Sequence, residues 1–278
     1  SGTDTGAYSP GADQFAIATA GVQRVRFDSS GSTFTGPVNV TNLNGGHLSG
    51  FRNLLINGNP IINQRGYVSG AATSGANEYT LDRWRVVVSG QSISWTDSEN
   101  VRTVTAPAGG VEQVIEGLNI LSGTYTLNWT GTATATVDGS SVSKGEAITL
   151  TGGTNATVRF SGGTFALVQL EPGTEATLFE RRSYGQELAL CQRYYCETKA
   201  SVRVYAAGAG AFYENQIYWP VTMRAAPTIN GPLGGLTSLI SSNLIVSPEV
   251  GGARNQMVAS ASGDAYALNR TVAASAEL

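Results

Sequence analysis

Residue types that usually carry catalytic chemistry are scarce in this sequence. The 278 residues include one histidine, His47, and two cysteines, Cys191 and Cys196. A single histidine excludes the Ser/His, Cys/His and multi-histidine arrangements, and two cysteines with one histidine cannot complete a four-ligand zinc site. We find no GxSxG elbow, phosphate-binding loop or EF-hand spacing. The sequence therefore predicts no catalytic residue, metal ligand or cofactor, and a protein that is not an enzyme.

One catalytic alternative stays open, because glycoside hydrolysis needs only two carboxylates about 5–10 Å apart. A calcium site among carboxylates is also compatible with the composition. Sequence alone brings no pair together, and most acidic side chains of a β-sandwich are solvated or pair with arginine. The residues concerned are Asp82, Asp97, Glu99, Glu112, Glu116 and Glu171.

Aromatic residues near the C-terminal end offer a different chemistry, since sugar binding uses flat rings together with a few polar groups. The run from Ile217 to Met223 alternates as one strand, in which Pro220 indicates an edge position or a bulge. This alternation places Trp219 with Ile217 and Val221, in the core. Four other rings are predicted to point away from it: Tyr205, Phe212, Tyr213 and Tyr218. These four are the candidate ligand-binding residues, either as a receptor-contacting patch or as a subunit interface or core packing.

Composition limits the class of protein. Charged residues make up 13% and hydrophobic residues 41% of the chain, and glycine is abundant at 35 residues. This balance favours turn-rich β structure over helices. The net charge is −3, and Lys144 and Lys199 are the only lysines, so a basic face for nucleic acid is not expected. No apolar run reaches the length of a membrane span and no export signal leads the chain, so neither membrane insertion nor secretion is expected.

Hydrophobic alternation divides the chain into four segments. Residues 1–50 show short period-2 strands around a turn at 28–31, with too few apolar positions to close a core within one chain, so we expect them to pack against copies of themselves. Residues 51–181 have many short strands and no helical stretch, which indicates a sandwich or jelly roll. The alternating positions predicted to face inward include Trp84, Val86, Val88, Ile93, Trp95, Tyr125, Leu127, Trp129, Ala133, Ala135, Val137, Val158, Phe160, Phe165, Leu167 and Gln169. Residues 182–200 hold the linking helix, and 201–278 return to β structure.

The helix is predicted over residues 183–198, with Ser183 and Gln186 as a capping box. Leu188, Cys191 and Tyr195 form its apolar stripe, which we interpret as core packing. On one helix, Cys191 and Cys196 would point about 140° apart. We therefore expect buried free thiols, which suits synthesis in a reducing compartment.

Several ordered motifs resemble a module of tailed-bacteriophage tail-fibre and virion-appendage proteins. The resemblance covers nearly the whole chain and is weakest over residues 229–275. Its opening motifs are FRNLLINGNP at 51–60, INQRG at 62–66 and YTLDRW at 79–84. Its closing motifs are VQLEPG at 168–173, ATLFERR at 176–182, YGQELALCQRYY at 184–195, PVTMRAAPT at 220–228 and AEL at 276–278. Upstream, GADQFAIAT at 11–19 and QRVRFDSSG at 23–31 resemble fibre-shaft repeats.

The resemblance implies a carbohydrate-binding-like jelly roll, a homotrimer, and a place on the virion surface after synthesis in the bacterial cytoplasm. Residues 1–50 would attach to other virion proteins, and the partner outside would be a host-surface glycan or protein receptor. It also implies structural roles: Asp82 and Trp84 would fix a strand and its core, and Glu180, Arg181 and Arg182 would join the sandwich to the helix. The resemblance supplies no catalytic or sugar-binding motif.

Three functions remain in competition. The first is a receptor-binding tail fibre. The second is a head fibre or capsid decoration protein that stabilises the particle, which would use the same modules. The third, a polysaccharide depolymerase tailspike, is disfavoured because the chain is short and lacks the repeats of a long parallel β-helix.

Overall fold

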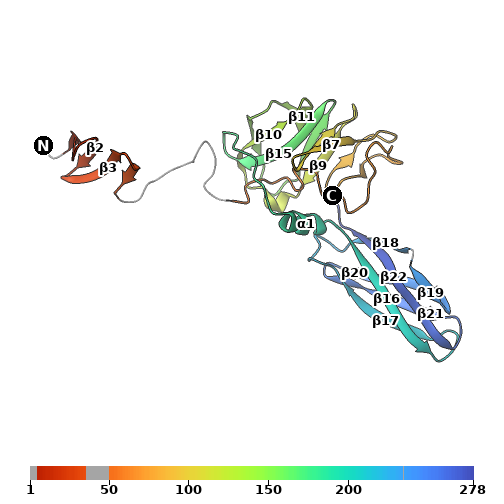
Figure 1. Cartoon of the computed structure of the whole chain (residues 1–278). Helices are drawn as coiled ribbons and strands as arrows, with labels where there is room; N and C mark the ends of the chain where they lie inside the picture. The colour runs from red at the N-terminus through yellow and green to blue at the C-terminus, as the bar shows by residue number, and fades with distance from the viewer. Residues whose placement is uncertain (1–4, 36–49, 234) are drawn as a thin grey trace. The chain divides into compact units, whose positions relative to one another are not determined.

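Strands dominate the computed structural model, which describes residues 5–35, 50–233 and 235–278 (Figure 1). These residues contain one α-helix and one short 3-10 helix, and all their strand pairs are antiparallel. The predicted mainly-β class with one helix is therefore confirmed. The chain divides into two units after Asn44, and each is described by itself. The sequence also predicts strand alternation at Val38 and Val40. These two residues and His47 lie outside the described residues.

The N-terminal unit is a four-stranded antiparallel sheet in sequence order. Its strands are β1 (Gly6–Tyr8), β2 (Phe15–Thr19), β3 (Val22–Asp28) and β4 (Gly31–Phe34). The predicted turn at 28–31 joins β3 to β4, and the Asp28 carboxylate caps it by accepting a hydrogen bond from the Ser30 amide at 2.9 Å. The hydrogen bond from the Ser30 hydroxyl, and after it the one from the Ser30 amide, holds the pKa of Asp28 below its usual value.

One face of this sheet is apolar and open. Register places Phe15 beside Phe27 and Ile17 beside Val25, which in turn pairs with Phe34. Phe15 and Phe27 touch with ring centroids 6.0 Å apart, yet they stay 48% and 43% exposed. Residues 5–35 form a single layer, so the described part of this unit offers no second layer to cover that face.

Two sheets that share one hydrophobic core begin the larger unit. One sheet has the order β13-β10-β15-β8-β7 and the other β12-β11-β14-β9-β6-β5. Their strands are β5 (Glu78–Tyr79), β6 (Arg85–Val86), β7 (Ser94–Ser98), β8 (Val101–Thr105), β9 (Val111–Ile115), β10 (Gly123–Thr130), β11 (Thr134–Val137), β12 (Ser140–Val142), β13 (Glu146–Leu150), β14 (Ala156–Ser161) and β15 (Thr164–Pro172), with the 3-10 helix η1 at Gly117–Asn119.

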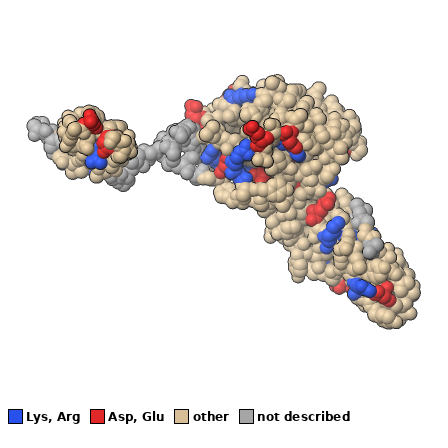
Figure 2. Space-filling model, viewed as in Figure 1, with Lys and Arg blue, Asp and Glu red and all other residues tan. Residues whose placement is uncertain are grey.

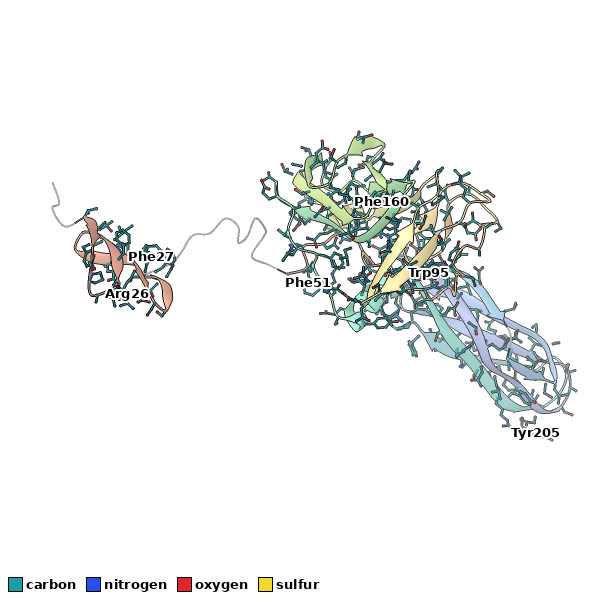
Figure 3. All side chains as sticks on the ribbon, turned by 45° about the horizontal axis from the view of Figure 1, so that its top comes forward. Arg26, Phe27, Phe51, Trp95, Phe160 and Tyr205 are labelled. Carbon is teal, nitrogen blue, oxygen red and sulfur yellow. The ribbon has the colours of Figure 1, made fainter. Side chains whose placement is uncertain are left out.

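The core follows the predicted alternation closely. Trp84 is fully buried against Phe165, at 5.2 Å between ring centroids, and donates its indole N–H to the Asn57 carbonyl at 2.9 Å. Phe160 stacks on Phe165 at 4.7 Å and meets Trp129 edge-on. Figure 3 shows Phe160 among the strands of the sandwich. Other residues predicted to face inward are also buried: Val86, Ile93, Tyr125, Leu127, Ala133, Ala135, Val137 and Val158.

Two predicted core positions are wrong, for different reasons. Leu167 adopts φ 49°, and the β10–β15 register shifts there, so Val168 and Leu170 fill the core instead. Val88 is 44% exposed because β6 ends at Val86, before alternation could carry Val88 inward.

The helix α1 (Tyr184–Gln192) starts as predicted, because Ser183 and Gln186 form a reciprocal capping box. It ends six residues earlier than predicted, and β16 begins at Tyr195. The β-branched and aromatic run after Arg193 pairs with β22, and this pairing overrides helix propensity.

The two cysteines therefore lie on different elements, Cys191 on α1 and Cys196 on β16, which corrects their predicted placement on one helix. Both are free and buried, as expected. Burial raises the pKa of the Cys196 thiol to about 11 and that of Cys191 well above its ordinary value. Such thiols stay protonated and unreactive near neutral pH.

Residues 195–275 form two further sheets that pack on each other, here called the distal sheets (Figure 1). One has the order β16-β22-β18, with β19 also paired to β22, and the other β17-β21-β20. The strands are β16 (Tyr195–Ala206), β17 (Phe212–Tyr218), β18 (Thr228–Leu233), β19 (Leu236–Ser238), β20 (Ile240–Glu249), β21 (Gly252–Ala259) and β22 (Gly263–Ser275).

The run from Ile217 to Met223 was predicted as one strand, and that prediction is wrong beyond Tyr218. Pro220 lacks an amide hydrogen and ends the ladder. Trp219 and Met223 nevertheless remain core residues, 6% and 1% exposed, because the loop folds back over the sheet edge. The core position predicted for Trp219 is thus confirmed.

A buried charge network joins the sandwich to the distal sheets. The carboxylate of Glu277, 6% exposed, pairs with Arg65 at 2.9 Å and with Arg83. Arg65 lies over the Tyr195 ring and Arg83 over the Tyr194 ring, each 3.7 Å from the centroid. Glu277 follows β22, and the tyrosines follow α1, so three distant segments meet in one cluster.

We expect Glu277→Gln to lower the free energy of unfolding by about 3 kcal/mol, because it leaves the buried guanidinium of Arg83 without its counter-charge. Urea unfolding followed by tryptophan fluorescence measures this. The control is Glu214→Gln, whose side chain is 41% exposed and lies 3.7 Å from Arg254; it should cost less than about 1 kcal/mol. Equal effects of the two variants would show that the cluster does not hold the parts together.

Candidate functional site

The four aromatic residues predicted to bind a ligand all lie in the distal sheets, but not in one patch. Tyr205 near the end of β16 is 81% exposed, and Phe212 at the start of β17 is 54% exposed. Figure 3 shows Tyr205 at the far end of these strands. The two rings flank the small-residue loop 207–211, yet they project from the outer faces of different sheets.

The other two predicted rings lie elsewhere. Tyr213 points inward, packs against the small core around Val202 and Met257, and its hydroxyl accepts a hydrogen bond from the Ala207 amide at 3.3 Å. Its predicted outward orientation is wrong, because Phe212 and Tyr213 are consecutive on a strand rather than in a loop. Tyr218 is 73% exposed but lies at the opposite end of β17, roughly 20 Å from Phe212 at 3.3 Å per residue.

Tyr205 has other neighbours that the sequence did not reveal. Register pairs it with Asp264 and pairs Arg203 with Tyr266 on the same outer face. Arg203 and Asp264 form an ion pair at 2.6 Å, and the Arg203 guanidinium lies 5.7 Å from the Tyr266 ring. Hydrogen bonds from Arg203 lower the pKa of Asp264, which stays charged. These residues come together through the β16–β22 register, which the sequence alone does not show.

A hollow of about 520 Å³ lies on the outer face of the six-stranded sheet of the sandwich. Cross-strand register lines up Thr136, Arg159, Glu112, Arg85 and Tyr79 in one row across five strands. Glu112 is 2% exposed and accepts from Arg85 at 2.9 Å and from Arg159 at 2.7 Å, one on each carboxylate oxygen. Both oxygens of the Glu112 carboxylate are taken up by arginines, so the row resembles structural support more than a poised reactive group.

Arginine side chains pair with most of the carboxylates that the sequence offered as candidates for glycoside hydrolysis. The five paired residues are Asp82 with Arg65, Asp97 with Arg102, Glu112 as above, Glu116 with Arg193 and Glu171 with Arg52. Burial raises the pKa of Asp82, and Arg65 and Gln64 oppose that shift. Asp82 and Trp84 are both fully buried, consistent with the structural roles that the resemblance implies.

Within the described ranges, no group of three or more His, Cys, Asp or Glu residues is placed to hold a metal ion. None of the helices described there is long and apolar enough to span a membrane. Charged side chains form small separate groups on the face shown in Figure 2, and uncharged residues make up most of it.

Comparison with known proteins found no match among family models, curated proteins or solved structures. The resemblance to phage appendages therefore rests on the sequence motifs alone.

The orientations of the distal tyrosines can be tested by stability. We expect Tyr205→Ser to change the free energy of unfolding by less than about 0.5 kcal/mol, because the ring is exposed. Tyr213→Ser should lower it by about 2–4 kcal/mol, since it removes a ring packed on the core. Urea unfolding of both variants is the measurement. A large loss for Tyr205→Ser would mean that its ring is packed and not available to a ligand.

Proposed function

We propose that this chain is a structural protein of a tailed-bacteriophage virion: a tail fibre that binds the host surface, and not an enzyme. The observation that carries the proposal is the open apolar face of the N-terminal sheet, on a thin unit that precedes a β-sandwich. A single-layer sheet with exposed Phe15, Ile17, Phe27 and Phe34 needs a partner to bury them. A fibre shaft made of several copies supplies such a partner, and residues 1–50 would also attach to other virion proteins.

The sandwich would be the carbohydrate-binding-like jelly roll. Its strand order supports this: β8, β15, β10 and β13 are neighbours in one sheet, and β9, β14, β11 and β12 in the other. Eight antiparallel strands shared in this way between two sheets fit the two Greek keys of a jelly roll. Such a module fits recognition of a host-surface glycan or protein.

Glu180 and Arg182 support the implied join between sandwich and helix. Glu180 accepts from the Phe51 and Asn53 amides. Arg182 donates to the Asn53 and Leu55 carbonyls and pairs with Glu187 of α1 at 3.2 Å. Arg181 takes no part in this join among the described residues.

The homotrimer makes a direct prediction. Light scattering of the purified chain should give about three times its 28.9 kDa, and the double variant Phe15→Ser, Phe27→Ser should move the mass toward one chain. Tyr8→Ser is the control, because Tyr8 is 42% exposed and lies on the opposite face of the same sheet. A wild-type mass near one chain contradicts the trimer.

The place on the virion can be tested by labelling particles with antibody fragments raised against residues 50–278. We expect label on a tail appendage in electron micrographs. Label spread over the head would instead favour a head fibre or decoration protein. Particles that bind no label, although the fragments bind the purified chain, would contradict the virion assignment.

A further inference from the structure

A second hollow on the sandwich, about 290 Å³, has a lining unlike the first. Three segments form it: the loop at 59–61, the turn between β7 and β8, and the stretch 179–187 that leads into α1. We call it the Phe179 hollow. Its lining consists of Asn59, Ile61, Asn100, Phe179, Arg181 and Tyr184, together with the Arg182–Glu187 ion pair.

The walls of the Phe179 hollow are fixed in place. The Asn59 side chain donates to the Asn100 carbonyl at 2.8 Å and accepts from the Arg102 amide at 2.9 Å, which ties the loop to the β7–β8 turn. On the other side, the buried Arg182 pairs with Glu187 and holds the start of α1 against the sandwich. A binding site whose walls are held in this way needs little ordering when a ligand enters.

The lining combines apolar surface with unused polar groups. Tyr184 is 61% exposed and Ile61 37% exposed, and both lie beside the partly buried Phe179 ring. Among the described residues, the side-chain amide of Asn100, the guanidinium of Arg181 and the hydroxyl of Tyr184 have no hydrogen-bond partner. In the larger hollow, by contrast, the two arginines already satisfy Glu112, and no aromatic ring is part of the lining.

A pyranose ring has the matching chemistry. Its C–H face packs on aromatic and aliphatic surface, and its hydroxyls accept from and donate to amide, guanidinium and phenol groups. The volume suits about one to two sugar residues. Arg181 adds a cation with no ion-pair partner among the described residues, and a carboxylate is the group that a guanidinium binds best, through two parallel hydrogen bonds.

We propose that the Phe179 hollow binds a pyranose residue that carries a carboxylate, as in an acidic bacterial surface polysaccharide. Tyr184 and Ile61 contact the ring face, Arg181 binds the carboxylate, and Asn100 binds a hydroxyl. This inference rests on the proposed role in host-surface binding and names the ligand and its site.

The probe is an oligomer of galacturonic acid, compared with an uncharged oligomer of galactose, added to the full chain and followed by saturation-transfer NMR and calorimetry. The acidic oligomer should bind at least tenfold more tightly than the neutral one. Tyr184→Ala should weaken binding of both at least tenfold, and Arg181→Gln should remove only the preference for the acidic oligomer. Tyr8→Ala is the matched control, an exposed tyrosine of the N-terminal sheet that belongs to no candidate binding site, and should change neither.

Binding of neither oligomer, or binding that Tyr184→Ala leaves unchanged, would overturn the site. A second copy of the chain could occupy the hollow instead of a sugar, and light scattering of Tyr184→Ala tests this. A fall in mass would show that the hollow is a contact between copies, which also overturns the proposal. The antibody labelling of particles does not depend on these results. If particles carry the label but the protein binds no acidic sugar, the sugar site is refuted and the virion assignment is not.

Discussion

The larger unit depends on one buried carboxylate. Glu277 lies between Arg65 and Arg83, and each guanidinium also covers a tyrosine at the junction of α1 and β16. Burying a charge costs free energy unless the charge is paired. The network therefore determines how the three segments are arranged more than it raises the overall stability. It brings together the sandwich, the end of the helix and the segment after β22, and thereby fixes the distal strands to the sandwich through side chains rather than through a shared sheet.

A second pair of charges shapes the hollow around Phe179. Arg182 pairs with Glu187 of α1 and donates to the Leu55 carbonyl, which fixes the helix start beside the sandwich. Arg181, the neighbour of Arg182 in sequence, is left outside this pairing. Both arginines line the hollow, but Arg182 is held by Glu187 and by backbone carbonyls, which leaves Arg181 as the guanidinium available to a ligand.

Much of the fold could be predicted because alternation reports burial directly. Tyr125, Leu127 and Trp129 were placed correctly by period two alone, and Ser183 with Gln186 located the helix start. What failed depended on information that is not local. The bulge at Leu167 changes which residues face inward, and the pairing of Tyr195 onward with β22 ends the helix early. Propensity cannot foresee either, since each is decided by a distant partner strand.

The candidate sites were harder to predict for the same reason. The ring of an exposed tyrosine can be guessed from alternation, as for Tyr205, but a binding hollow requires segments that register and loop contacts bring together. Ile61, Asn100 and Tyr184 are far apart in the sequence, and no single motif contains them. They meet because Asn59 ties its loop to the β7–β8 turn and Arg182 holds α1 nearby. Asn59 and Arg182 are thus structural residues that make binding possible, because they fix the segments that carry the binding side chains.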